Sequence, residues 1–131
     1  MMKIKIIVNV LVFLMAVLQG VYAIYAFFDP VAFSELRGTE LFSASDSDWI
    51  VIYASRTLFV ALVVGFLLFK KQYKLLVWIS LFGTVMPITD AWLAYQAGAP
   101  SVVVYKHVAT VIYLIVTLVA LKLVLRSENN A

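Results

Sequence analysis

The sequence contains no cysteine and only one histidine among its 131 residues. The absence of cysteine excludes a disulfide framework, a thiolate metal site, an iron–sulfur cluster and a cysteine nucleophile. One histidine is too few for a zinc or di-iron site, and no carboxylate–histidine set has the spacing that such sites need. The sequence also lacks a glycine-rich phosphate loop and a serine in a nucleophile-elbow pattern. We therefore predict no metal and no other cofactor.

Charged residues are also scarce, at roughly half the share that is usual in a soluble domain. They make up 13% of the chain, whereas apolar residues make up 65% and the mean hydropathy is +1.04. This composition indicates a protein whose main partner is a lipid bilayer. The net charge of +3 does not indicate a nucleic-acid partner, because the basic residues lie mostly at the ends of apolar segments. At this length we expect one domain, residues 1–131.

Four long apolar segments lie at about residues 4–28, 49–69, 75–95 and 102–124. Each is close to the ~20 residues that a helix needs to cross the hydrocarbon layer. An open strand would leave its backbone unpaired in lipid, so helices are expected. A closed barrel would need shorter, alternating segments. The predicted fold class is therefore all-α, an integral membrane four-helix bundle that forms a single transmembrane domain.

The first segment has a second interpretation. The basic residues Lys3 and Lys5, the apolar run and Val21-Tyr22-Ala23 together resemble a cleavable signal peptide. The apolar run continues to Phe28, however. We therefore expect a retained transmembrane helix.

Basic residues mark one side of the predicted bundle. They lie near the N-terminus, between the second and third segments (70–74) and in the C-terminal tail, and with four spans these places share one side. The opposite side holds the acidic loop 29–48, in which Arg37 is the one basic residue. Because short basic loops stay in the cytoplasm, we predict that both termini are cytoplasmic. The predicted location is a bacterial plasma membrane.

The acidic loop is predicted to begin with a short helix. Asp29 can cap a helix, Pro30 suits the first helical position and Gly38 can end the helix. Apolar and polar residues are mixed between these ends, which is typical of a helix that lies at the membrane surface. We therefore expect a short interfacial helix on the outer side.

Four ionisable residues lie within the apolar segments, namely Arg56, Asp90, Lys106 and His107. Counted from the outer ends of their segments at 1.5 Å per residue, all lie roughly 6–11 Å below the outer boundary. Three different helices therefore bring their charges to one layer. Charged groups inside a membrane are costly and usually face a partner or a cavity, so this layer is the candidate functional site.

Each of these residues has a functional and a structural interpretation. Asp90 and His107 are candidates for an acid–base pair, with Arg56 holding a carboxylate or a developing negative charge. Alternatively, Arg56 and Asp90 form an ion pair that joins the second helix to the third. Lys106 is either a binding residue or a side chain that reaches up to the outer headgroups. His107 alone would usually be a hydrogen-bonded interior residue.

Polar residues extend this layer along the fourth segment. Lys106, Thr110 and Tyr113 recur on one helical face, and we predict that Thr110 and Tyr113 also contribute to binding. Alternatively, the threonine only bonds back to its own helix. In the third segment, Pro87 frees the carbonyl of Gly83 and is expected to kink the helix just before Asp90.

Pairs of small residues in the first and second segments predict close helix packing. They are Ala16 with Gly20 and Ala61 with Gly65, each at the small-xxx-small spacing. The spacing does not distinguish packing within one chain from packing between two chains.

Three short motifs within these segments form a recognisable set. They read Ala54-Ser55-Arg56-Thr57, Pro87-Ile88-Thr89-Asp90 and Lys106-His107-Val108. The set, with the loop from Asp29-Pro30 to Gly38, resembles the DUF4267 family of small four-helix membrane proteins, which is distantly similar to the DoxX-like families. The resemblance implies the architecture but no activity. The DoxX-like link implies redox partnerships, although this chain has no cysteine and no second histidine to hold a haem.

Two functions remain equally open from the sequence. The polar layer could bind or convert an apolar or lipid-like small molecule that enters from the outer leaflet. Alternatively, the protein is a non-catalytic accessory or scaffold subunit, whose charges fix helix register or bind a membrane protein partner or a second copy of the chain. A cavity beside Arg56, Asp90 and His107 that opens to lipid would favour the first function. A solidly packed layer would favour the second.

Overall fold

The computed structural model describes residues 2–130, and this part of the chain is built from helices without strands. The elements are α1 (Met2–Phe28), α2 (Pro30–Arg37), the 3-10 turn η1 (Ala44–Asp46), α3 (Ser47–Phe69), α4 (Tyr73–Gly83), α5 (Val85–Gln96) and α6 (Ser101–Asn129). Four helical stretches are long and apolar enough to cross a membrane: α1, α3, α6, and α4 with α5 as Tyr73–Gln96. The prediction of an all-α four-helix transmembrane bundle is confirmed, and the protein is an integral membrane protein.

Most apolar side chains of the bundle point outward. In the most apolar stretch of each span, at most 22% of the residues are buried inside the protein. A water-soluble bundle would hide such a surface, whereas lipid covers it without cost. The bundle therefore has a thin core, and small differences in helix spacing decide whether its interior is filled or open.

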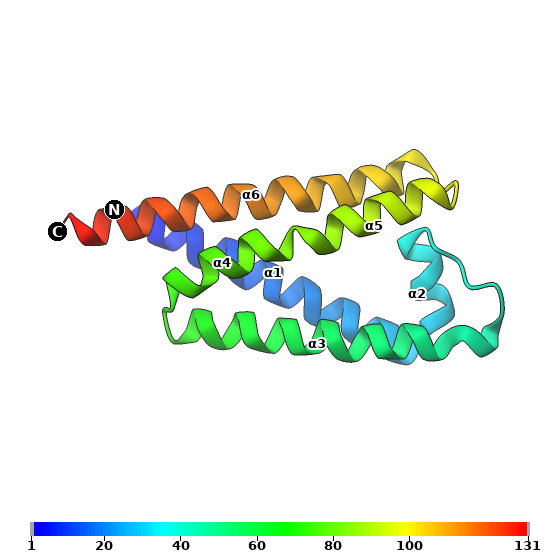
Figure 1. Cartoon of the computed structure of the whole chain (residues 1–131). Coiled ribbons are helices and arrows are strands. Elements are labelled where there is room, and N and C mark those ends of the chain that lie inside the picture. Colours follow the sequence, from blue (N-terminus) through cyan, green and yellow to red (C-terminus); the bar gives the residue numbers. More distant parts are fainter. Residues whose placement is uncertain (1, 131) are drawn as a thin grey trace.

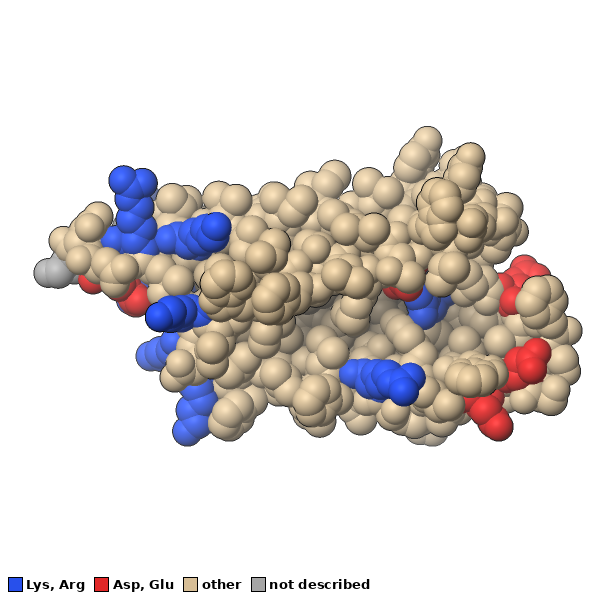
Figure 2. Space-filling model, viewed as in Figure 1, with Lys and Arg blue, Asp and Glu red and all other residues tan. Residues whose placement is uncertain are grey.

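The core is filled mainly at the end that carries both termini. One cluster of buried residues joins α1, α3, α4 and α6 there, and it consists of Val8, Val12, Val64, Tyr73, Leu76, Val77, Leu121 and Val124. A smaller cluster of Ala26, Phe33 and Ala54 lies near the opposite end. Figure 1 shows that the N- and C-termini lie side by side, far from α2. Figure 2 shows that most of the visible basic side chains gather at the terminal end, whereas most of the visible acidic ones lie at the α2 end.

Small residues bring α1 and α3 together. These two helices make the most extensive contact of any pair in residues 2–130. A Cβ added at Gly20 would lie 4.0 Å from the Cβ of Ala61, whereas one added at Gly65 would meet no atom within 4 Å. Gly20 and Ala61 therefore pack helices within one chain, and Gly65 faces open space.

Replacing Gly20 with leucine is expected to destabilise the protein by about 1–3 kcal/mol, because the larger side chain overpacks the α1–α3 contact. Gly65→Leu, the matched control, should change stability by less than about 0.5 kcal/mol. Thermal unfolding in detergent measures both. If Gly65→Leu lowers the stability as much as Gly20→Leu does, Gly65 contacts another molecule.

The third span is interrupted, as Pro87 predicts. Helix α4 ends at Gly83 and α5 begins at Val85, with Thr84 between them. Because proline has no backbone N–H, the carbonyl of Gly83 lacks its helical donor. The Thr84 hydroxyl donates to the Leu81 carbonyl at 2.7 Å and the Thr84 N–H contacts the same oxygen at 3.3 Å, which tightens the last turn of α4. The interruption lets α4 and α5 pack separately against α6.

Helix α2 has the ends that the sequence predicts. The Asp29 carboxylate accepts a hydrogen bond from the Ala32 N–H at 3.1 Å, and Pro30 is the first helical residue. Gly38 ends the helix with φ +77°, and its N–H donates to the Glu35 carbonyl at 2.9 Å. The helix lies at the end of the bundle opposite both termini (Figure 1).

One face of α2 packs into the bundle. Phe33 is only 1% exposed, and its ring centroid lies within 6 Å of the rings of Tyr22, Tyr25 and Tyr53. Ser34 is fully buried. This inward packing turns the C-terminal end of α2 toward α5 and α6, which positions the candidate site.

Candidate functional site

A cavity of about 480 Å³ lies inside the bundle between the two buried clusters. Toward the end of the bundle that carries the termini, the cavity is lined mainly by apolar residues, including Val12, Val60, Val64, Leu76, Ile79 and Leu114. Near α2 its lining is polar and includes Gln19, Tyr22, Arg37, Tyr53, Arg56, Asp90, Lys106, His107 and Thr110. The volume lies within the ~300–1,000 Å³ that is usual for small-molecule sites.

The cavity is open on one side of the bundle. Helix α3 packs against α1 and touches α5 hardly at all. Figure 2 shows a hollow between α3 and the helices above it, with one basic and one acidic side chain visible inside. The opening therefore lies on the lateral surface of the bundle, between α3 and α5.

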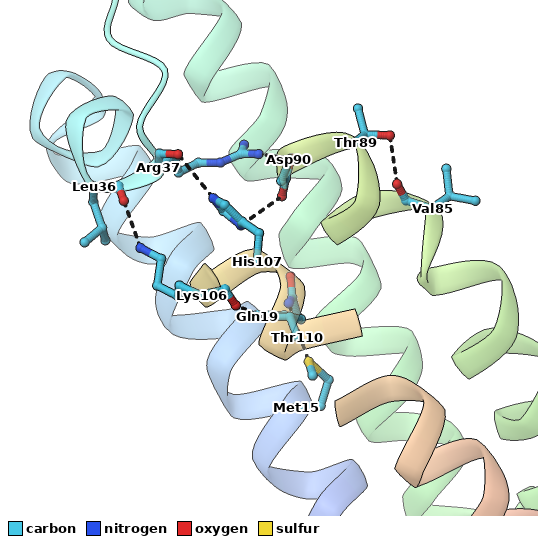
Figure 3. A network of polar contacts seen from close by, with 10 residues as sticks. All are labelled: Met15, Gln19, Leu36, Arg37, Val85, Thr89, Asp90, Lys106, His107 and Thr110. Atoms are coloured by element: carbon cyan, nitrogen blue, oxygen red, sulfur yellow. Dashed lines mark hydrogen bonds and ion pairs between the residues drawn. The ribbon is translucent and has the colours of Figure 1, made fainter. Parts of the chain in front are cut away.

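Asp90 pairs with Arg37. Nη2 of Arg37 donates to Oδ1 of Asp90, and the two side chains are only 16% and 22% exposed. The guanidinium also lies 4.3 Å from the centroid of the Tyr53 ring, a cation–π contact. The pair joins α2 to α5 at the polar end of the cavity (Figure 3).

The predicted ion pair between Arg56 and Asp90 is therefore wrong. The inward packing of Phe33 brings Arg37 to Asp90, although the two residues are 53 positions apart. Arg56 lies on the cavity wall with an exposed side chain, and it forms no ion pair within residues 2–130. The missed residue had one signal in the sequence, since Arg37 is the lone basic residue of an acidic loop.

Lys106 and His107 bind the C-terminal end of α2. Nζ of Lys106 donates to the Leu36 carbonyl at 2.8 Å, and Nε2 of His107 lies 3.2 Å from the Arg37 carbonyl oxygen (Figure 3). Cations are favoured at a helix C-terminus, where carbonyl groups lack helical donors. The Lys106 amine is therefore held by a backbone carbonyl within the protein.

The contact with Arg37 fixes the tautomer of His107. A carbonyl oxygen can only accept a hydrogen bond, so Nε2 of His107 must carry the hydrogen. The other ring nitrogen, Nδ1, then faces Oδ2 of Asp90 at 4.0 Å. Nε2 is thus held by the backbone at the end of α2, and Nδ1 is the ring nitrogen that faces Asp90 at the cavity wall.

The other predicted binding residues are placed differently. Thr110 lines the cavity, but its hydroxyl donates to the Lys106 carbonyl of its own helix at 3.1 Å. Tyr113 donates to the Leu11 carbonyl at 2.6 Å and so joins α6 to α1. It is absent from the cavity wall. Within residues 2–130, no group of three or more His, Asp or Glu residues is placed to hold a metal ion.

One of the three comparisons with known proteins gave a match. No curated protein and no solved structure gave a significant match. The model of a family described as a domain of unknown function, DUF4267, matches residues 14–121, which include all four spans in whole or in large part. The resemblance predicted from the motifs is confirmed, while the more distant likeness to DoxX-like families stays a prediction. The chain therefore belongs to the DUF4267 family.

Proposed function

We propose that this protein binds an amphipathic, lipid-like small molecule that enters sideways from the bilayer. The observation that carries the proposal is the cavity, which opens on the side of the bundle, is apolar toward the end that carries the termini and is polar near α2. An acyl or isoprenoid tail fits the apolar part, while a polar head meets the layer that contains Arg37, Asp90 and His107. A scaffold that needed no ligand would gain from filling this space with its own side chains.

The energetics of such a site differ from those of a soluble pocket. A tail that leaves lipid for an apolar cavity gains little, because lipid is as apolar as the protein interior. Affinity then comes from filling the void, which restores dispersion contacts, and from contacts with the polar head. Selectivity therefore depends mainly on the head.

The charges support the proposed orientation. Lys3 and Lys5 lie in the first turns of α1, and Lys70, Lys71 and Lys74 lie in or next to the turn between α3 and α4, at the end that carries the termini. Short basic segments stay in the cytoplasm. We place this end in the cytoplasm of a bacterial cell, so that the polar end of the cavity lies in the outer leaflet.

Besides binding, His107 would allow the site to transfer a proton. Asp90 is engaged by Arg37 and acts as a positioning residue, whereas His107 lines the cavity with Nδ1 facing Asp90. If the bound molecule is converted, His107 is the acid or base.

A second candidate function is that of an accessory subunit. It is favoured by the intrachain contacts of Arg37, Asp90, Lys106 and His107, which show that these charges also fasten α2 to the bundle. In that case the outward apolar faces would bind a membrane protein partner or a second copy of the chain.

The experiment fills the cavity without touching the charges. Val60 lines the cavity, whereas Leu62, two residues later on α3, is 64% exposed on the outer face. Native mass spectrometry of purified protein, followed by lipid extraction, should detect a bound amphipath in the wild type and in Leu62→Trp. We expect Val60→Trp to lose most of it, because the indole occupies the space of the tail.

The same measurement separates the two candidate functions. Equal recovery of bound molecules from Val60→Trp and Leu62→Trp would refute binding in the cavity. A protein partner or a second chain that remains bound to all three proteins would then favour the accessory subunit.

A further inference from the structure

We infer that the cavity selects a molecule with an anionic head and that Arg56 is the residue that binds this head. The inference rests on the proposed binding function and names the class of molecule. A carboxylate or a phosphate has the required chemistry, because both present two or more oxygens that carry negative charge.

The charge balance of the cavity wall supports this inference. Three cationic side chains, those of Arg37, Arg56 and Lys106, line the cavity together with a single carboxylate, that of Asp90. Ionised groups at membrane depth need compensation, since lipid offers none. An anionic ligand would reduce this positive excess, and a cationic one would increase it.

Two of the three cations already have partners within the protein. Arg37 pairs with Asp90, and Lys106 donates to the Leu36 carbonyl. The Arg56 side chain forms no hydrogen bond or ion pair within residues 2–130. Arg56 is therefore the cation whose donors are available to a ligand.

The position of Arg56 also suits this role. It lies on α3, nine residues after Ser47, which is about 14 Å along the helix axis. Helix α3 forms one edge of the lateral opening, since α5 makes almost no contact with it. A head that moves from the bilayer toward Asp90 and His107 must pass between these helices. The guanidinium presents a planar set of N–H donors that matches a carboxylate or phosphate in a bidentate contact.

The test compares probes that share a tail and differ in the head. Radiolabelled oleate, oleoyl lysophosphatidic acid and uncharged oleyl alcohol are bound to purified protein in an uncharged detergent, at a pH at which the acids are ionised. We expect the wild type to bind at least one of the two anions about tenfold or more tightly than the alcohol, as charge-assisted hydrogen bonds allow. The anion with the larger ratio identifies the head as a carboxylate or a phosphate.

Arg56→Gln should reduce this ratio to near one and leave the affinity for oleyl alcohol unchanged. Arg126→Gln, which removes an exposed arginine at the other end of the bundle, should leave the ratio as in the wild type. An unchanged ratio in Arg56→Gln, with binding that Val60→Trp abolishes, would overturn the role of Arg56 and leave the binding site standing. The absence of any binding that Val60→Trp reduces would overturn both.

Discussion

Replacing Asp90 with asparagine is expected to destabilise the protein by about 3–5 kcal/mol, since it leaves a mostly buried guanidinium without its partner. The Arg37 side chain is 16% exposed and its main ionic contact is Asp90. Asparagine is nearly isosteric but uncharged, so the loss reflects charge more than shape. Because the pair joins α2 to α5, the first effect should be the release of α2 from the bundle. Glu40→Gln, which neutralises an exposed carboxylate of the same loop, is the matched control and should have almost no effect.

A single cysteine can report the release of α2. The chain has no cysteine of its own, and Ser34 is fully buried on the inner face of α2. In a Ser34→Cys background, a maleimide reagent should react slowly while α2 is packed and at least tenfold faster after Asp90→Asn. Thermal unfolding in detergent gives the stability change in parallel. Slow labelling in Asp90→Asn, equal to that in Glu40→Gln, would show that the ion pair does not hold α2.

The double variant Arg37→Gln/Asp90→Asn distinguishes the loss of the ion pair from the cost of burying an unpaired charge. Removing both charges leaves no unpaired ion inside the protein, so the double variant should be more stable than Asp90→Asn alone. If the two losses instead add, Arg37 and Asp90 act independently. The double variant also tests the accessory-subunit alternative. If the charge pair only fastens α2 to the bundle, removing both charges should leave the binding of a partner protein unchanged.

The sequence predicted the features that depend on local chemistry. The spans follow from the length of apolar segments, the break near Thr84 follows from the missing N–H of Pro87, and the ends of α2 follow from Asp29 and Gly38. The sequence also predicted that Arg56, Asp90 and His107 share one layer, because the rise per residue of a helix is fixed, and all three line one cavity.

What the sequence could not give is the rotation and the tertiary packing of the helices. In lipid, a span is apolar on every face, so no amphipathic pattern shows which side points inward. Tyr113 was assigned to the binding layer because it shares a helical face with Lys106 and Thr110, but its hydroxyl donates to a carbonyl of α1. The partner of Asp90 was missed for a related reason, since the pairing depends on how Phe33 seats α2 between the spans.

The second large effect is expected at Gly38, where α2 meets the turn between α5 and α6. Gly38 has φ +77°, and an added Cβ would lie 2.7 Å from the Cβ of Ala99 and 2.8 Å from Cγ1 of Val103. Alanine in a left-handed conformation costs about 1–2 kcal/mol. The clash adds about 1–3 kcal/mol if the neighbours must move. We therefore expect Gly38→Ala to destabilise the protein by about 2–5 kcal/mol.

Gly98→Ala is the control that isolates the clash from the backbone strain. Gly98 has φ +70°, but a Cβ added there would meet no atom within 4 Å, so only the strain of about 1–2 kcal/mol should appear. The Ser34→Cys reporter should label faster in Gly38→Ala than in Gly98→Ala, because only the first substitution pushes α2 away from α6. The same displacement would separate Lys106 from the Leu36 carbonyl and His107 from the Arg37 carbonyl, which directly precede Gly38 in the chain. Equal stability and equal labelling in the two variants would mean that the end of α2 is not pressed against this turn, and the polar end of the cavity would then lack the fixed geometry that selective binding needs.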